Sequence, residues 1–314
     1  MRYYFAPLEG LTDSIYRRLH HKYFSGADRY YMPFISPTIH RSLTHKEDRE
    51  LPMADSEAFI AVPQILTKVP EDFLWAADQC AQRGYTEVNL NVGCPSGTVV
   101  SKGKGSGMLR SPADLDRFLD AIFSGCSVDV SVKTRLGLET PEEFPALLEV
   151  FNRYPIKELT VHPRVRKDFY KEPIREVWFR YAYENSRNPL CYNGNLCTKA
   201  DMEGVARRYP KVESVMLGRA LIGDPGLLSP NGTTAETLKQ FHDELMEEYI
   251  RVFGTARNAM FRMKENWGFL HKRFDDTDRL WKKLRKTTDY EEYMAITSEI
   301  FHTLPLAESL HADW

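Results

Sequence analysis

The sequence predicts an α/β protein, a (β/α)8 TIM barrel followed by a small all-helical C-terminal domain. Short apolar runs alternate with segments of helical periodicity from the N-terminus to about residue 220. Such alternation is typical of parallel strands joined by crossover helices. Eight such runs occur, which fits a barrel of the usual size of ~250 residues. A doubly wound open sheet is the alternative, weakened because no G-x-G-x-x-G motif follows the first run.

Several of the predicted strands are nearly continuous in apolar residues, as expected of strands covered on both faces. The predicted strands are 3–6, 29–33, 59–65, 87–91, 129–134, 158–162, 190–193 and 214–218. The amphipathic segments between them are predicted helices, namely 12–23, 70–83, 112–123, 141–154, 174–185 and 199–209. Ser111-Pro112 and Thr140-Pro141 mark two helix starts, because each places a capping hydroxyl before a proline at the first helical position.

Two other regions break the alternation. Residues 36–55 are predicted to form a long loop, or a helix disturbed by Pro37 and Pro52. After Pro225, the turn-forming run 229–234 marks a boundary. Beyond it the sequence predicts only helices, at 237–253, 256–269, 277–286 and 290–304. We therefore expect a barrel domain over residues 1–230 and a helical domain over residues 235–314.

The composition is that of an ordinary soluble globular protein, with 42% hydrophobic and 27% charged residues among 314. The net charge of −2 means that a nucleic-acid partner has to meet a local basic patch. Five cysteines without a C-x-x-C motif argue against a disulfide framework or a zinc site and favour the cytoplasm. No apolar run approaches the ~18 residues of a membrane span. We expect no metal and no membrane partner, and a monomer as the default oligomeric state.

The most informative motif is Asn91-Val92-Gly93-Cys94-Pro95-Ser96, which follows a predicted strand and precedes the glycine-rich segment 102–107. A cysteine between a strand end and a flexible loop is well placed to meet a substrate. Pro95 stiffens the turn that presents its thiol. A free cysteine is also a common small core residue, so this motif alone leaves both interpretations open. The glycine-rich segment is predicted to be a mobile flap over the substrate, with a plain linker as the alternative.

Polar side chains follow most of the other predicted strands, and the carboxyl ends of barrel strands meet at one mouth. The residues at these strand ends, most of them polar or glycine, are Pro7, Leu8, Glu9, Gln64, Lys133, Arg135, His162, Arg164, Asn193, Gly194, Asn195, Gly218 and Arg219. A single lysine or histidine at such a place is usually solvated. Their convergence at one mouth predicts a functional site.

The glycines after the last two strands indicate the chemistry of the ligand. Gly194 and Gly218 lie where barrels of this kind bind phosphate, and Arg219 adds a charge. Gln64 and Lys133 could meet the polar edges of a flat heterocycle, and a lysine suits a ring that becomes anionic on reduction. Flavin mononucleotide (FMN) meets these requirements. An aldolase with a Schiff base on Lys133 would use the same phosphate pocket, so these residues alone leave both open.

The ordered set of motifs resembles the tRNA-dihydrouridine synthases. It comprises residues 6–13, Gln64, 91–95, 133–135, 162–164, 193–194 and 218–219. The resemblance covers the barrel and continues more loosely into the helical tail. It implies an FMN enzyme that reduces the C5–C6 double bond of selected uridines in tRNA, with NADPH as reductant and Cys94 as general acid.

The resemblance also implies roles for single residues. FMN would be bound by Pro7, Leu8, Glu9, Gln64, Lys133, Asn193, Gly194, Asn195, Gly218 and Arg219, with His162 beside the flavin. Asn91 would help to place the uracil, and we expect Arg135 and Arg164 on the substrate side. Three positions depart from the family pattern: Leu8 stands for a usual methionine, Pro163 for a glycine, and Asn195 for an acidic residue or glycine.

The helical tail is locally basic, with ten positive and four negative residues between 257 and 286. Interleaved aromatic residues suit phosphate tracking and base stacking. We expect Trp267 and Phe269 to belong to the core of the tail and Lys282, Lys283, Arg285 and Lys286 to contact RNA. Two alternatives remain, a flavin barrel that reduces a free pyrimidine, similar to a dihydroorotate dehydrogenase, and an RNA-binding relative without catalysis.

Overall fold

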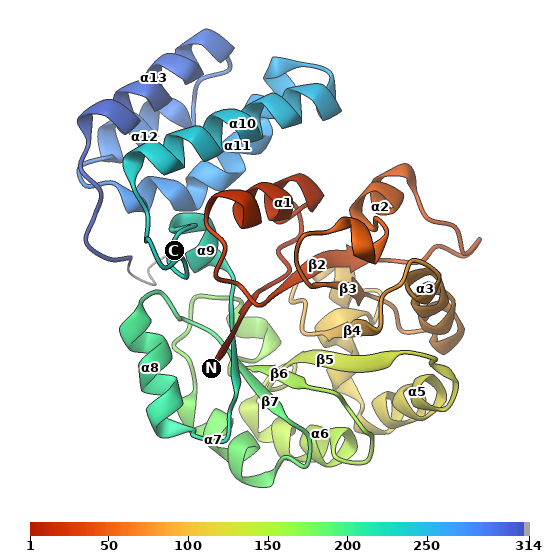
Figure 1. Cartoon of the computed structure of the whole chain (residues 1–314). Coiled ribbons are helices and arrows are strands. Elements are labelled where there is room, and N and C mark those ends of the chain that lie inside the picture. Colours follow the sequence, from red (N-terminus) through yellow and green to blue (C-terminus); the bar gives the residue numbers. More distant parts are fainter. Residues whose placement is uncertain (311–314) are drawn as a thin grey trace. The chain divides into compact units, whose positions relative to one another are not determined.

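In the computed structural model, which describes residues 1–310, eight parallel strands close into a barrel (Figure 1). The strands are β1 (Arg2–Phe5), β2 (Arg29–Ile35), β3 (Ala61–Ile65), β4 (Glu87–Val92), β5 (Asp129–Arg135), β6 (Leu159–His162), β7 (Leu190–Asn193) and β8 (Ser214–Leu217). Neighbours in the barrel follow chain order. The predicted barrel and its eight strands are confirmed.

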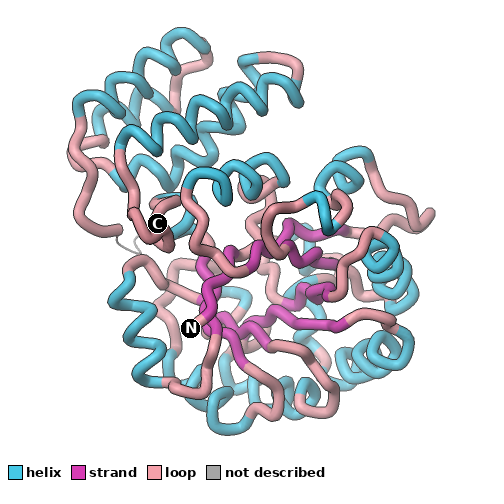
Figure 2. Tube along the Cα trace, in the orientation of Figure 1, coloured by secondary structure: helices cyan, strands magenta, loops and turns pink. Residues whose placement is uncertain are grey.

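Helices lie outside the strands, as Figure 2 shows in cyan and magenta. Those between the strands of the barrel are α3 (Pro70–Gln82), α5 (Pro112–Gly125), α6 (Phe144–Phe151), α7 (Glu176–Asn185) and α8 (Lys199–Arg208). The predicted cap at Ser111 is present, because its hydroxyl accepts from the Asp114 N–H. At the second predicted start, the Glu143 carboxylate accepts from the Thr140 N–H at 3.0 Å, around the 3-10 turn η3 (Pro141–Glu143).

Short helices occur within residues 36–55, for which a long loop or a disturbed helix is predicted, and around the predicted flap. Within residues 36–55, α2 (His45–Glu50) begins at a capping box, and η1 (Ala54–Ser56) follows Pro52. The helix α4 (Gly97–Val100) precedes the glycine-rich segment 102–107, and η2 (Gly105–Arg110) begins within it. The prediction of a mobile flap is wrong for residues 105–107, which are buried. Two of the three are glycines, and a Cβ on Gly107 would lie 2.9 Å from the Val100 carbonyl oxygen.

The barrel interior contains an apolar cluster and, at the amino ends of its strands, paired charges. Its centre is a cluster of buried side chains, Tyr4, Ala6, Tyr31, Val62, Cys191 and Met216. Charges are paired at the amino ends of the strands, where Glu87 accepts from Arg29 at 2.7 Å and from Lys157 at 3.0 Å. In this fold the amino ends serve stability and the carboxyl ends serve function.

The chain divides into two compact units, and the first comprises residues 1–9, 28–194 and 204–216. The second comprises residues 10–27, 195–203 and those from 217 on. It contains α1 (Ser14–Tyr23), α9 (Arg219–Gly223), α10 (Ala235–Phe253), α11 (Ala256–Leu270), η5 (His271–Arg273), α12 (Asp278–Leu284) and α13 (Tyr290–Thr303). The four predicted tail helices are confirmed, and α1 and α9 pack against α10 and α11. The division at residues 230–235 stays a prediction about domains.

A buried hydrogen-bonded triad organises the core of this helical unit. Trp267 Nε1 donates to the Tyr293 hydroxyl at 2.9 Å, and that hydroxyl lies 2.8 Å from His242 Nε2. The Asp243 carboxylate can only accept, so Nδ1–H of His242 donates to it at 2.9 Å, and the other nitrogen of the neutral ring accepts from the Tyr293 hydroxyl. Burial lowers the pKa of His242, which favours this neutral form. The expected burial of Trp267 is confirmed, and Phe269 is half-buried.

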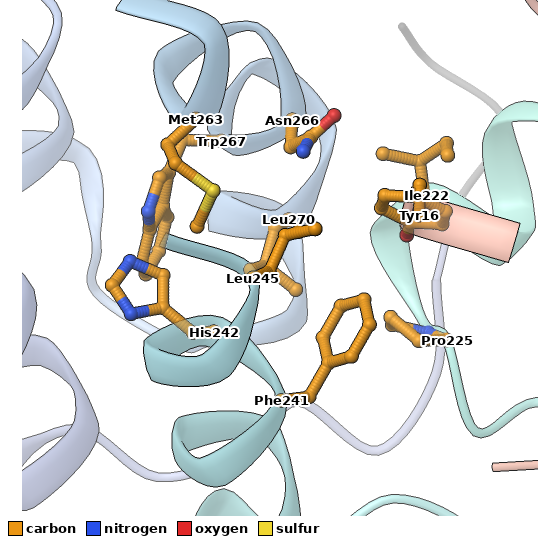
Figure 3. Close-up of a pocket in the computed structure, with 10 residues that line it drawn as sticks. All are labelled: Tyr16, Ile222, Pro225, Phe241, His242, Leu245, Met263, Asn266, Trp267 and Leu270. Atoms are coloured by element: carbon orange, nitrogen blue, oxygen red, sulfur yellow. The ribbon is translucent and has the colours of Figure 1, made fainter. Parts of the chain in front are cut away.

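Figure 3 shows a small cavity within the helical unit. Its lining is almost entirely apolar, apart from Asn266, whose amide has no hydrogen-bond partner among residues 1–310. The centre of a water molecule can move within only about 10 Å³ of this space, roughly the volume that one water needs. The cavity therefore cannot hold a flavin or a nucleotide.

None of the helices within residues 1–310 combines the length and the apolar character that crossing a bilayer requires. The same residues contain no group of three or more His, Cys, Asp or Glu side chains that could hold a metal ion.

The triad in the helical unit generates a stability prediction. We expect Tyr293→Phe to lower the free energy of unfolding by about 1–3 kcal/mol, because it leaves buried polar atoms of Trp267 and His242 without a partner. Urea unfolding followed by tryptophan fluorescence measures this change. Tyr290→Phe, three residues earlier on the same helix and only partly buried, is the matched control and should change little. Equal stability of the two variants would contradict the role given to the triad.

Candidate active site

The turn that carries Cys94 is built by the side chain of Asn91. This residue lies near the end of β4, and its Oδ1 accepts from the backbone N–H groups of Gly93 at 3.1 Å and Cys94 at 2.9 Å. The following segment closes the turn from the other side, because the Ser106 hydroxyl donates to the Cys94 carbonyl at 2.8 Å. The half-buried Cys94 is therefore held by bonds on both sides rather than presented on a free loop.

A directional chain of side-chain hydrogen bonds runs from this turn across the barrel interior. Because Oδ1 of Asn91 accepts from the backbone, its Nδ2 donates to Gln64 Oε1, at 2.7 Å. Gln64 Nε2 then donates to Asn89 Oδ1 at 2.8 Å, and Asn89 Nδ2 donates to the Ser131 hydroxyl at 2.9 Å. All of these side chains are buried. The chain leaves Gln64 with one N–H and one lone pair for a ligand.

Sequence reasoning missed Asn89 and Ser131. A signal was present, because Asn89 precedes Asn91 by two residues and alternate residues of a strand share a face. Ser131 could be found only from the pairing of β4 with β5, where it lies opposite Asn89.

Lys133 lies opposite Asn91 in the same strand pair, so both side chains belong to one face of the sheet. Its ammonium forms no hydrogen bond or ion pair with any of residues 1–310. Burial and the nearby Arg135 guanidinium lower the pKa of Lys133 to about 8. A desolvated amine without a partner destabilises a protein, and such groups concentrate at binding and catalytic sites.

The pKa of the Cys94 thiol is shifted in the opposite direction. Burial raises its pKa, although the positive charges of Arg135 and Lys133 and a backbone N–H at Ser96 act in the other direction. The thiol is therefore protonated at neutral pH, which suits a proton donor and not a nucleophile.

Arg135 and Arg164 are more deeply buried than a contact with a substrate requires. Arg135 is 1% exposed, and its guanidinium donates to the carbonyls of Gly93 at 3.1 Å, Val165 at 3.0 Å and Phe169 at 2.8 Å. Arg164 is 2% exposed and lies 3.1 Å from His162 Nε2. Both residues join loops at the carboxyl ends of the strands. Their contact with a substrate stays a prediction.

Gly194, directly after β7, is a place where only glycine fits. Its φ of 146° lies in the region that favours glycine, and a Cβ there would lie 2.7 Å from Ile174 Cδ1 and 3.3 Å from His162 Cδ2. Next to it, Asn193 Nδ2 donates to the Met216 carbonyl at 2.7 Å. The packing of Ile174 and His162 against the Gly194 backbone therefore favours glycine.

The remaining predicted residues are divided between the two units. Pro7 and Leu8 are half-buried in the barrel unit, and Glu9 is exposed and paired with Lys46 at 2.8 Å. The helical unit contains Asn195, Gly218, Arg219, Lys282, Lys283, Arg285 and Lys286. Within the barrel unit, the structure brings Gln64, Asn91, Cys94, Lys133, Arg135, His162, Arg164, Asn193 and Gly194 to the carboxyl ends of β3 to β7.

A family model and several known proteins are similar to this chain in sequence. The family model described as dihydrouridine synthase matches residues 4–309. The chain is 24% identical to the probable tRNA-dihydrouridine synthase 1 of Synechocystis sp., over 96% of this chain and 86% of that protein. It is 29% identical to a probable tRNA-dihydrouridine synthase of Staphylococcus aureus (70% and 68% covered) and 26% identical to tRNA-dihydrouridine synthase B of Pasteurella multocida (72% and 67% covered).

Solved structures show the fold at low sequence identity. Morphinone reductase is similar with a TM-score of 0.52 at 14% identity, over 72% of this chain and 84% of that one. An old yellow enzyme homologue from Zymomonas mobilis is similar with a TM-score of 0.51 at 12% identity, over 72% and 86%.

The raised pKa of Cys94 can be tested without a substrate. We expect alkylation of Cys94 by iodoacetamide to rise with pH through a midpoint above the ~8.5 of a free thiol. Mass spectrometry of the peptide that contains Cys94 measures the rate at each pH. The same peptide in urea-unfolded protein is the control and should show the ordinary midpoint. A folded-state midpoint at or below the unfolded one would contradict a protonated thiol.

Proposed function

Because the chain belongs to the dihydrouridine synthase family, we propose that it reduces the C5–C6 double bond of selected uridines in tRNA to 5,6-dihydrouridine. The observation that carries the proposal is the Cys94 thiol, held protonated on a rigid turn within electrostatic reach of Lys133. The relatives named tRNA-dihydrouridine synthase support the choice of tRNA as substrate.

FMN is the cofactor that we propose, with NADPH as its reductant. Three features of the barrel unit fit it: the unpartnered Lys133 ammonium, the remaining hydrogen-bonding capacity of Gln64, and the bare backbone at Gly194. The residues proposed to hold it are Pro7, Leu8, Glu9, Gln64, Lys133, His162, Asn193, Gly194, Asn195, Gly218 and Arg219. When bound and reduced, it would supply a hydride to C6 of the uracil ring.

Cys94 would supply the matching proton. Addition of a hydride at C6 places negative charge on C5 and O4, and the thiol proton passes to C5, so that one hydride and one proton saturate the double bond. The nearby Arg135 and Lys133 charges favour the thiolate that remains, and water returns its proton. The Asn91 amide would position the uracil together with the turn that carries the thiol, since it already holds Cys94 by its N–H. We propose Arg135 and Arg164 as further contacts on the substrate side.

The catalytic role of Cys94 is open to a direct test. We expect Cys94→Ala to bind flavin and to accept electrons from NADPH, but to lose dihydrouridine formation by at least about 100-fold, because general acids contribute factors of about 10²–10⁴. Flavin absorbance and analysis of nucleosides from a tRNA transcript give the two measurements. Cys126→Ala, which removes another half-buried thiol from the same unit, is the control. Full tRNA activity of Cys94→Ala would refute the proton-donor role.

The helical unit would provide the main phosphate contacts. Several of its basic residues are engaged internally: Arg262 pairs with Asp13 at 2.7 Å, Arg273 with Asp224 at 3.3 Å, and Arg279 with Glu299 at 3.0 Å. By contrast, four residues on and after α12 are exposed and form no ion pair with any residue that the structure describes: Lys282, Lys283, Arg285 and Lys286. We propose that these four bind RNA.

Charge reversal tests this surface. We expect Lys282→Glu combined with Lys283→Glu to weaken binding of a tRNA transcript and to reduce the salt slope of log K by about 1 for each cation lost. Arg187→Glu combined with Lys211→Glu, two exposed cations of the barrel unit, is the matched control. An unchanged affinity would exclude this face of the tail. Turnover of free uridine as efficient as that of tRNA would instead favour a reductase of free pyrimidines.

A further inference from the structure

We propose that residues 166–171, here called the aromatic loop, form a second RNA-contacting surface on the barrel unit, where bases that flank the target uridine stack on Phe169 and Tyr170. This inference rests on the proposed function. No predicted site residue lies in this loop, which follows β6 and precedes α7.

The aromatic loop exposes two neighbouring rings among cations. Phe169 and Tyr170 are each 40% exposed. The Arg166 guanidinium lies 5.2 Å from the centroid of the Phe169 ring. Lys167 and Lys171 are exposed and form no ion pair with any of residues 1–310. Exposed rings interleaved with cations are the usual platform for single-stranded nucleic acid, because every base has a face that can stack.

The acidic residues of this region do not cancel its charge. Asp168 is buried, and its carboxylate forms an ion pair with Arg175. Glu172 is exposed just beyond the loop, which leaves the three cations of the loop in excess. These cations would contribute more binding free energy with a phosphate backbone than with a protein partner.

The backbone of the aromatic loop is held in an unfavourable shape. Phe169 has a φ of 49°, which a bulky residue rarely adopts. The Arg135 guanidinium bonds its carbonyl at 2.8 Å, and the Arg166 N–H donates to the Gly137 carbonyl at 2.9 Å. Such strain persists only where the surroundings impose it, and it is concentrated at functional sites. Here it accompanies two neighbouring rings that are each 40% exposed.

The aromatic loop is also joined to the candidate active site. The Tyr170 ring centroid lies 5.7 Å from that of His162 and 5.1 Å from the Arg135 guanidinium. The same guanidinium holds the Gly93 carbonyl, next to Cys94. A uridine that leaves its stack deprives its neighbours of a stacking partner. Rings beside the site would replace that partner, which lowers the free energy of extruding the base.

The test compares ring-removing and ring-keeping variants of the full-length, flavin-loaded protein on an unmodified tRNA transcript. We expect Phe169→Leu and Tyr170→Leu each to weaken binding, or kcat/KM for dihydrouridine formation, by about 5- to 150-fold, the range for one stacked base. Phe169→Tyr should stay within about twofold, because it keeps the stacking face. Val177→Ala and Lys211→Ala, exposed residues outside the aromatic loop, are the controls.

A glycine variant separates loss of the ring from loss of the fold. Phe169→Gly should keep or raise Tm, because glycine tolerates the positive φ, while its RNA affinity falls as in Phe169→Leu. Ultraviolet crosslinking of a 4-thiouridine-substituted transcript should also label residues 166–171. The proposal is overturned if the leucine and glycine variants bind and react like the unaltered protein, or if crosslinks fall only elsewhere. If the unaltered protein itself neither binds nor modifies tRNA, the proposed function fails as well.

Discussion

The buried guanidinium of Arg135 is the interaction on which the arrangement of the site depends. It bonds carbonyl groups of the turn after β4 and of the loop after β6, two segments more than 60 residues apart in the sequence. Burial lowers the pKa of this group, yet an arginine stays charged in proteins. A desolvated cation needs acceptors, so these carbonyls are drawn to one point. Loss of the side chain would release both segments together.

The polar chain inside the barrel is a second constraint. The backbone N–H groups of Gly93 and Cys94 fix its direction, because both donate to Asn91 Oδ1. The orientation of each following side-chain amide, as far as the bond to Ser131, is then determined. A net contribution of about 1 kcal/mol for each such bond is modest. The greater effect of these bonds is to fix one arrangement of the side chains, because a buried polar group that turned away would lose its partner. Lys133 remains outside this chain of hydrogen bonds, which is why we propose it as a group that contacts the cofactor.

The basic residues of the helical unit are of two kinds, those in ion pairs within the unit and those that are exposed without such a pair. Arg262 is largely buried and pairs with Asp13, which the Tyr249 hydroxyl also bonds, at 3.1 Å. Such residues hold helices together, although their charges made the tail look uniformly basic in sequence. By contrast, Lys282, Lys283, Arg285 and Lys286 are exposed and form no ion pair with any of residues 1–310. The local excess of positive charge in the sequence therefore counts some residues that are engaged in ion pairs within the helical unit.

The sequence by itself determined the eight strands, the tail helices and the family, because apolar periodicity, helix caps and the Cys94 motif are local properties. It also indicated which residues gather at the carboxyl ends of the strands, since a barrel leaves them no other place. Tertiary structure alone decided what those residues do. Arg135 became an internal clamp, Asn89 and Ser131 joined the site, and residues 105–107 became a packed wall instead of a flap. Each of these outcomes depends on partners that are distant in sequence, and the side-chain pattern of one segment carries no record of which atoms another segment brings to it.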